Sequence, residues 1–156
     1  MCGRYYLERT SIDFQRLVKR ICEIQELPVF KDGEIYPSDN CLVLVNKDNS
    51  VYASAKQWGY KKDKVYINAR YENLPYTKLF APLKNNPCVI VANGYYEWDK
   101  NKEKHYFSPK LGLYYLAGIY IEDHFVILTT ESNNDIHHRM PLIIPTNQVK
   151  SYLGVN

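Results

Sequence analysis

The segment PCVIVANGYYEW, residues 87–98, does most to define the fold class of this chain. PCVIVA (87–92) is an apolar run of strand length, and YYEW (95–98) predicts a second strand that is rich in aromatic residues. Between them, Asn93 and Gly94 form a pair that is typical of tight turns. The segment therefore predicts two consecutive strands joined by a short turn.

Strand patterns continue on both sides of this segment. CLVLV (41–45) and VYASAKQW (51–58) flank the turn-like NKDNS and predict a hairpin. Further short strands are predicted at residues 65–68, 104–107, 113–120 and 124–130. A series of short strands joined by short turns predicts a mainly antiparallel sheet or a partial barrel.

The clearest helix is TSIDFQRLVKRICEI (10–24). Its apolar residues fall at i, i+3, i+4, i+7 and i+8 and form one stripe, which we expect to be buried: Phe14, Leu17, Val18, Ile21 and Cys22. Thr10 followed by Asp13 resembles a capping box. Short helices are also predicted within 75–83 and over 147–153, the second capped by Thr146. The predicted fold is α+β, a single domain over residues 1–156 with a mainly antiparallel, barrel-like β core flanked by a few short helices.

Composition restricts the environment of the protein. In 156 residues, 20 Lys+Arg stand against 17 Asp+Glu, and the net charge of +3 is a mild bias toward nucleic acid. No apolar run approaches the roughly 18 residues of a membrane span, and the N-terminus lacks a signal-peptide pattern, so we expect a cytoplasmic protein. The four cysteines form no C-x-x-C pair and lie at no zinc-finger spacing from a histidine, so we expect free thiols and no metal site: Cys2, Cys22, Cys41 and Cys88.

Cys2 follows the initiator methionine in the opening MCGRY. If Met1 is removed, Cys2 presents an α-amine and a thiol on adjacent carbons. The amine can condense with an aldehyde to a Schiff base, and the thiol can then close a five-membered thiazolidine ring on the same carbon. Alternatively, the thiol is the nucleophile of an amidohydrolase and the α-amine is its base. Taken alone, a chance cysteine near a terminus is the simpler interpretation.

A second candidate segment is YINARYE (66–72), where Asn68 and Arg70 lie at strand spacing and share one face. The Asn68 amide offers both a donor and an acceptor, and the Arg70 guanidinium suits bidentate phosphate binding. Taken alone, a polar strand end with a surface arginine is the better interpretation of this pattern.

The aromatic strand at 95–98 carries one carboxylate, Glu97. Alternation places Glu97 and Tyr95 on one face, and Tyr96 and Trp98 on the other. A carboxylate among so many rings loses water, and desolvation favours the neutral acid that acid–base catalysis uses. A solvent-facing glutamate on an aromatic hairpin is an equally good interpretation.

The segment DIHHRMP (135–141) places two histidines and an arginine before Met140 and Pro141, which indicates a loop or a helix end. One histidine is a candidate general acid or base, and Arg139 is a candidate phosphate ligand. The residue types alone do not decide which histidine matters.

Taken together and in this order, MCGRY, WG, NAR, GYYEW and IHxRMP resemble the SOS-response-associated peptidase (SRAP) domain family. The resemblance runs from residue 2 to about Leu142. It implies an SRAP-like fold and a sensor of abasic sites in single-stranded DNA, whose N-terminal cysteine forms a stable thiazolidine crosslink with the sugar aldehyde. Members of the family have also been described as autoproteolytic.

The resemblance implies a catalytic role for four residues. Cys2 matches the nucleophile that forms the crosslink, and Asn68 matches the asparagine that hydrogen-bonds the reacting terminus. Glu97 matches the glutamate that assists sugar-ring opening and proton transfer. His137 matches the histidine that acts as acid or base at the Schiff base, whereas His138 falls at a variable position.

The resemblance also implies a set of DNA contacts. Phosphate binding is implied for three arginines: Arg4, Arg70 and Arg139. Trp58 matches a tryptophan that packs against unstacked bases. Pro37, in EIYPSDN, resembles the proline of a family loop, although its neighbours differ.

The chain departs from the family pattern in two respects. It is shorter than a typical member, mainly between Glu72 and Cys88 and after Pro141, and Asn93 replaces an acidic residue. The expected partner is single-stranded DNA with abasic sites, bound by a monomer without cofactor, metal or membrane and associated with the nucleoid when DNA is damaged. The alternatives are an N-terminal-nucleophile amidohydrolase and a non-catalytic single-strand-binding module that uses aromatic stacking.

Overall fold

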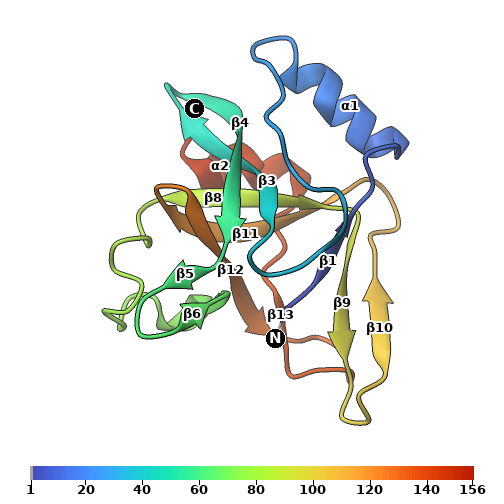
Figure 1. The fold of residues 1–156 in the computed structure, drawn as a ribbon, viewed down its shortest axis with the longest axis vertical. Helices are drawn as coiled ribbons and strands as arrows, with labels where there is room; N and C mark the ends of the chain where they lie inside the picture. Colours follow the sequence, from blue (N-terminus) through green and yellow to red (C-terminus); the bar gives the residue numbers. More distant parts are fainter. Residues whose placement is uncertain (1) are drawn as a thin grey trace.

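The structure is a computed structural model that describes residues 2–156. Most of its secondary structure consists of strands (Figure 1). In chain order the strands are β1 (Tyr5–Leu7), β2 (Gly33–Ile35), β3 (Asn40–Lys47), β4 (Ser50–Trp58), β5 (Tyr60–Lys61), β6 (Val65–Tyr66), β7 (Asn68–Arg70), β8 (Pro87–Ala92), β9 (Gly94–Trp98), β10 (Lys104–Phe107), β11 (Tyr114–Ile121), β12 (His124–Glu131) and β13 (Arg139–Pro141). The helices are α1 (Ile12–Ile21) and α2 (Val149–Leu153), with 3₁₀ turns η1 (Tyr71–Asn73) and η2 (Thr146–Gln148). The α+β class is confirmed.

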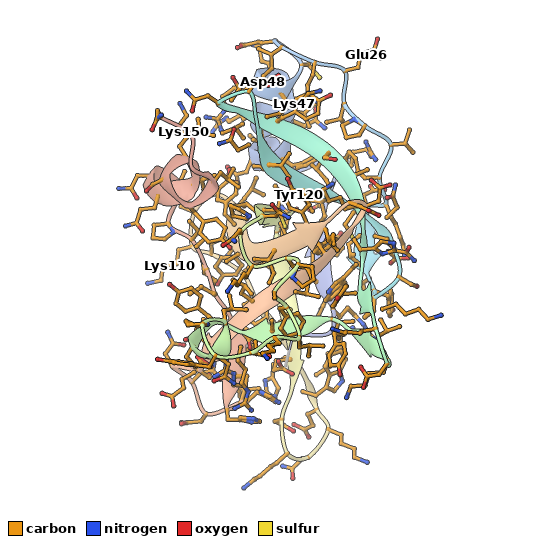
Figure 2. All side chains as sticks on the ribbon, turned by 90° about the vertical axis from the view of Figure 1, so that its left-hand side faces the viewer. Glu26, Lys47, Asp48, Lys110, Tyr120 and Lys150 are labelled. Carbon is orange, nitrogen blue, oxygen red and sulfur yellow. The ribbon has the colours of Figure 1, made fainter. Side chains whose placement is uncertain are left out.

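The larger sheet curls into a partial barrel. Its strands follow the order β11-β8-β3-β4-β12-β13, β7 joins β12, and β12 also pairs back with β11. The β4–β12 pairing is parallel and rests on two residue pairs, so the ring is only partly closed. The predicted hairpin is its most regular part, in register from Asn40↔Gln57 to Lys47↔Ser50. Lys47 and Asp48 lie at the outer end of this hairpin (Figure 2).

A second sheet, in the order β10-β9-β1-β2, lies beside the ring and carries the N-terminal strand (Figure 1). β8 and β9 belong to different sheets, so Asn93 and Gly94 do not form the predicted hairpin turn. Gly94 is already the first residue of β9, where a Cβ would collide with Tyr106 and the Phe107 carbonyl. Asn93 fixes this junction, since its side chain accepts from the Glu8 amide at 2.7 Å and donates to Ser11 Oγ at 3.0 Å.

The first helix forms where it was predicted, but its ends differ. Ser11, not Thr10, caps α1, because its hydroxyl accepts a hydrogen bond from the Phe14 amide. The helix ends at Ile21, and Cys22 is an exposed cap residue rather than part of the buried stripe.

Three other predicted elements are corrected. The strand predicted at 65–68 is two strands, β6 and β7, which pair with different neighbours. Residues 75–83 form turns instead of a helix. The last helix is only α2, preceded by η2, and Thr146 lies within η2 without a side-chain cap.

One hydrophobic core joins buried side chains of the ring, of the four-stranded sheet and of both helices. Trp58 is one of its largest fully buried side chains, stacked on Phe125 and tilted against Tyr5 of β1. The N-terminal strand is thus packed directly onto the barrel. Across residues 2–156, no helix is both long and apolar enough to cross a membrane.

Candidate functional site

Cys2 is a fully buried member of the core and lies three residues before the first residue of β1. Burial raises the pKa of its thiol to about 12, and the negative charge of Glu97 acts in the same direction. The thiol is therefore protonated at neutral pH. The predicted removal of Met1, on which the 1,2-aminothiol depends, lies outside the described residues.

Glu97 lies on the inner face of β9 and is only 5% exposed. The ladder between β1 and β9 brings it to Cys2: Tyr5 pairs with Tyr95, and the Tyr96 amide donates to the Arg4 carbonyl at 3.0 Å. The predicted alternation is confirmed, and the solvent-facing interpretation of Glu97 is wrong. A buried carboxylate beside a buried thiol is a suitable pair for proton transfer.

Asn68 begins β7, a short strand that runs parallel to β12. Its Nδ2 donates to the Ile67 carbonyl at 3.1 Å, which fixes the orientation of the amide. Its Oδ1 is buried and has no hydrogen-bond partner within the described chain. Because the Ile67 side chain is the nearest neighbour of Gly3, the start of β7 lies against the N-terminal segment. Asn68 thus holds an unused acceptor near the N-terminus.

His137 lies in the loop before β13, which Asn134 orders by accepting the amide of Ile136 at 2.9 Å. The Arg139 amide donates to His137 Nδ1 at 3.0 Å. Nδ1 also lies 3.2 Å from the Arg139 carbonyl, but a backbone N–H is an obligatory donor, so we assign Nδ1 as acceptor and the ring proton to Nε2. The ring of His138 stacks on His137, with centroids 4.4 Å apart.

A groove of about 630 Å³ lies between the end of β9 and the loop that carries His137. Trp98 lines it together with Asp99 and both histidines. No role was predicted for Trp98, although the alternation in GYYEW places it on the opposite face from Glu97, where it stays partly exposed. Trp98 is therefore the aromatic side chain beside the groove.

Trp58 was expected to pack against DNA bases, and the structure contradicts this expectation. Its side chain is 0% exposed, and its Nε1 donates to the Ile67 carbonyl at 3.0 Å. Neither ring face is open to a base. Trp58 instead supports the backbone just before Asn68.

Arg4 lies beside aromatic side chains at the four-stranded sheet, and Pro37 belongs to the turn next to one of them. The Arg4 guanidinium lies 4.3 Å from the Tyr36 ring centroid and 4.8 Å from that of Trp98. Pro37 opens the turn that positions Tyr36, which the Asp39-to-Tyr36 backbone hydrogen bond closes. Arg4 Nη1 is 3.7 Å from Glu34, and its Nε is buried without a partner within residues 2–156. Arg4 thus connects Cys2 to the aromatic wall of the groove.

Arg139 and Arg70 differ in their availability to a phosphate. Arg139 is 7% exposed, and its Nη2 lies 2.6 Å from Glu72 Oε1 and donates to Thr129 Oγ1 at 3.0 Å. A phosphate would have to displace these partners, so the structure does not present Arg139 as predicted. Arg70 is exposed, lines a smaller groove of about 280 Å³ with Asn68, and makes no ion pair within the described chain.

Comparison with protein families identifies the class of protein that carries this arrangement. The family described as SOS response associated peptidase (SRAP) matches residues 1–156. The chain belongs to this family, and the predicted resemblance is confirmed.

Similar proteins are found among curated sequences and solved structures. The abasic site processing protein YoaM of Bacillus subtilis is 30% identical over 186 aligned positions, covering 99% of this chain and 79% of YoaM. YoqW of Bacillus phage SPbeta, also named an abasic site processing protein, is 29% identical and 80% covered. A phage-related protein of Bordetella bronchiseptica and a protein of Bacteroides thetaiotaomicron share the fold, each with a TM-score of 0.77 over 97% of this chain and 81% of theirs, at 20% and 19% identity.

Proposed function

We propose that this protein processes abasic sites in single-stranded DNA by forming a covalent thiazolidine crosslink through Cys2 after Met1 has been removed. Membership of the SRAP family and the names of its relatives support the role in abasic-site processing. The observation that carries the chemical part is the buried pair of Cys2 and Glu97.

The Cys2 thiol is fully buried, and burial favours the neutral thiol, which is a weaker nucleophile than a thiolate. In the proposed order, the α-amine therefore attacks the C1′ aldehyde first, and loss of water gives an iminium ion. The sulfur then adds to the same carbon, and the thiol proton passes to a neighbouring base. The C–S bond closes the ring and neutralises the iminium nitrogen, so charge and atoms balance. Glu97 is the proposed proton acceptor.

Asn68 and His137 take complementary parts in this scheme. The unused Asn68 Oδ1 accepts a hydrogen bond from the new amine and aims its lone pair at the aldehyde. With Nδ1 held by the Arg139 amide, His137 is a neutral imidazole whose Nε2–H donates a hydrogen bond to the oxygen that leaves as water. The proton that this oxygen takes up comes from solvent, and the proton released later by the thiol returns to solvent through Glu97.

A crosslinking assay tests the proposal. Mature protein is mixed with an oligonucleotide that contains one abasic site, and heat-stable adducts are separated on a denaturing gel. The adduct should disappear in Cys2→Ala and persist in Cys22→Ala, a matched control because Cys22 is the exposed thiol of the chain. An undiminished adduct from Cys2→Ala would contradict the proposal.

The same assay separates the alternatives. A single-strand-binding module would bind the oligonucleotide in both cysteine variants and crosslink in neither the wild type nor the variants. An amidohydrolase would need Cys2 for cleavage of an amide and would give no stable adduct with the aldehyde.

A further inference from the structure

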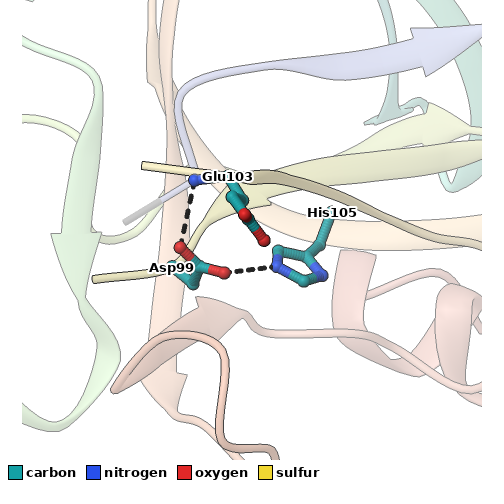
Figure 3. Close-up of side chains that lie close together, drawn as sticks. All are labelled: Asp99, Glu103 and His105. Atoms are coloured by element: carbon teal, nitrogen blue, oxygen red, sulfur yellow. Dashed lines mark hydrogen bonds and ion pairs between the residues drawn. The ribbon is translucent and has the colours of Figure 1, made fainter. Parts of the chain in front are cut away.

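The tip of the β9–β10 hairpin gathers three potential metal-binding side chains. One donor atom each of Asp99, Glu103 and His105 lies within 4.8 Å of the other two (Figure 3). Asp99 Oδ2 lies 2.7 Å from His105 Nε2. The sequence does not reveal this cluster, because its residues lie at no recognised metal-binding spacing.

The backbone of the tip holds Asp99 in a fixed orientation. Its Oδ1 accepts hydrogen bonds from the amides of Asn101 at 2.8 Å and Glu103 at 3.0 Å. The other oxygen, Oδ2, is therefore directed away from the backbone and toward His105, as Figure 3 shows. A carboxylate held in this way is prepared to coordinate without losing further conformational freedom.

The arrangement places two negative charges opposite each other. β9 and β10 pair with Lys104 opposite Trp98, and the Asp99 amide donates to the Glu103 carbonyl at 3.0 Å, so Asp99 and Glu103 form the next cross-strand pair. Like charges directly opposite across a ladder are destabilising. Within residues 2–156, Glu103 makes no ion pair that would offset this repulsion.

Lys104, the neighbouring lysine on β10, does not neutralise the charge of this cluster. Lys104 binds Glu34 at 3.0 Å and lies over the Tyr96 ring, on the face opposite to that of Glu103 and His105. The cluster face is the face that carries Glu97, because His105 is the register partner of Glu97. Asp99 also lines the groove of about 630 Å³ beside His137.

We propose that Asp99, Glu103 and His105 form a binding site for a divalent transition-metal ion such as Zn²⁺. Two carboxylate oxygens and one imidazole nitrogen suit such ions, whereas an oxygen-only set would favour Mg²⁺ or Ca²⁺. With metal–ligand bonds of about 2.1 Å at tetrahedral angles, two ligand atoms lie roughly 3.4 Å apart, so the Asp99 and His105 atoms need to separate by about 0.7 Å to admit the ion. Three protein ligands leave at least one position for water at the wall of the groove.

Zinc titration in the absence of DNA tests this site independently of the proposed crosslinking. Wild-type protein is titrated with ZnCl₂ by calorimetry, and the His105 ring nitrogens are followed by NMR. We expect one ion per chain and a shift of His105 Nε2. His105→Ala and Asp99→Asn should weaken binding by on the order of tenfold or more, since each loses one of three ligands.

Two matched controls exclude other zinc ligands. His138→Ala and Cys22→Ala remove an accessible imidazole and the exposed thiol, and both should bind zinc like the wild type. Glu103→Gln tests the site without disturbing the hairpin, because the Glu103 side chain is exposed and its backbone makes the turn contacts. Zinc affinity unchanged in Glu103→Gln and His105→Ala, lost in His138→Ala, or absent from the wild type at about 1 mM zinc would overturn the proposal.

Discussion

The buried thiol of Cys2 lies within electrostatic reach of the Glu97 carboxylate, whose charge adds to burial in raising the pKa of the thiol to about 12. Pairing of β1 with β9 brings the two residues together, although 95 positions separate them in the chain. A protonated thiol next to a buried carboxylate favours a mechanism in which an amine reacts first and the thiol second.

Glu97→Gln should change both the rate of crosslinking and the pKa of the Cys2 thiol. Crosslinking to abasic DNA should slow by on the order of a hundredfold or more, as expected for loss of a general base. The pKa of the Cys2 thiol should fall, because a raising charge is removed, while burial keeps it above the ordinary value. Peptide-resolved alkylation rates against pH measure this shift.

Cys88 is the internal control for that experiment. Burial also raises the pKa of its thiol, but Glu97 is not among the causes. Its alkylation profile should be the same in wild type and Glu97→Gln. A shift at Cys88 as large as that at Cys2 would indicate general loosening of the fold rather than loss of the Cys2–Glu97 interaction.

The two tryptophans should respond in opposite ways. Trp58→Ala should lower the free energy of unfolding by about 3–5 kcal/mol, because a large core side chain is lost. Trp98→Ala should leave stability nearly unchanged and weaken binding of single-stranded DNA by about 1–3 kcal/mol, as for loss of one stacking ring. Thermal unfolding and fluorescence anisotropy distinguish these outcomes, and reversed effects would restore the role predicted from the family.

Substitutions of Arg70 and Arg139 should also have contrasting effects. Arg70→Ala should weaken binding of single-stranded DNA and reduce the salt slope by about 1, since an exposed cation is lost. Arg139→Ala should instead destabilise the fold by leaving Glu72 and Thr129 without their partner. Binding measured at several salt concentrations tests both, and an unchanged slope in Arg70→Ala would rule out its phosphate contact.

The Glu72–Arg139 pair predicts a pH dependence of stability. The hydrogen bond from Arg139 lowers the pKa of Glu72 below its ordinary value, so the ionised pair stabilises the folded state. This stabilisation is complete above the unfolded-state pKa of about 4.3 and is lost as pH falls through the lower folded-state value. Because Glu72 is partly exposed, we expect about 1 kcal/mol. The difference in unfolding free energy between wild type and Glu72→Gln, measured by urea unfolding at each pH, should be constant from pH 6 to 7 and shrink toward pH 3; a difference that grows toward pH 3 would contradict this.

The sequence predicts most strands because local alternation reports which face is buried. The hairpin of β3 and β4 and the whole of β10 follow the predicted ranges closely. The sheet to which a strand belongs is not decided locally. Asn93-Gly94 has the composition of a hairpin turn, yet it joins strands of two different sheets. Gly94 is needed there because Tyr106 and Phe107 leave no room for a Cβ. Cys22 fits the helical period, but the helix ends one residue earlier.

For the candidate site, too, the sequence predicts local features but not contacts between distant segments. Alternation correctly predicts the inward face of Glu97, since it depends on neighbouring residues alone. The burial of Trp58 and the pairing of Arg139 with Glu72 depend on segments distant in the chain, and a motif cannot report them. The Asp99, Glu103 and His105 cluster requires knowledge of the hairpin register, which the sequence does not provide.

The intact mass of the protein before and after incubation with abasic single-stranded DNA tests the central claim most directly. We expect that the free protein lacks Met1 and that the adduct has the summed mass of protein and DNA less one water, as a thiazolidine requires. A heat-stable adduct of that mass formed by protein that still carries Met1, or by Cys2→Ala, would contradict this claim, because neither chain has the free aminothiol and a simple Schiff base of the same mass hydrolyses on heating.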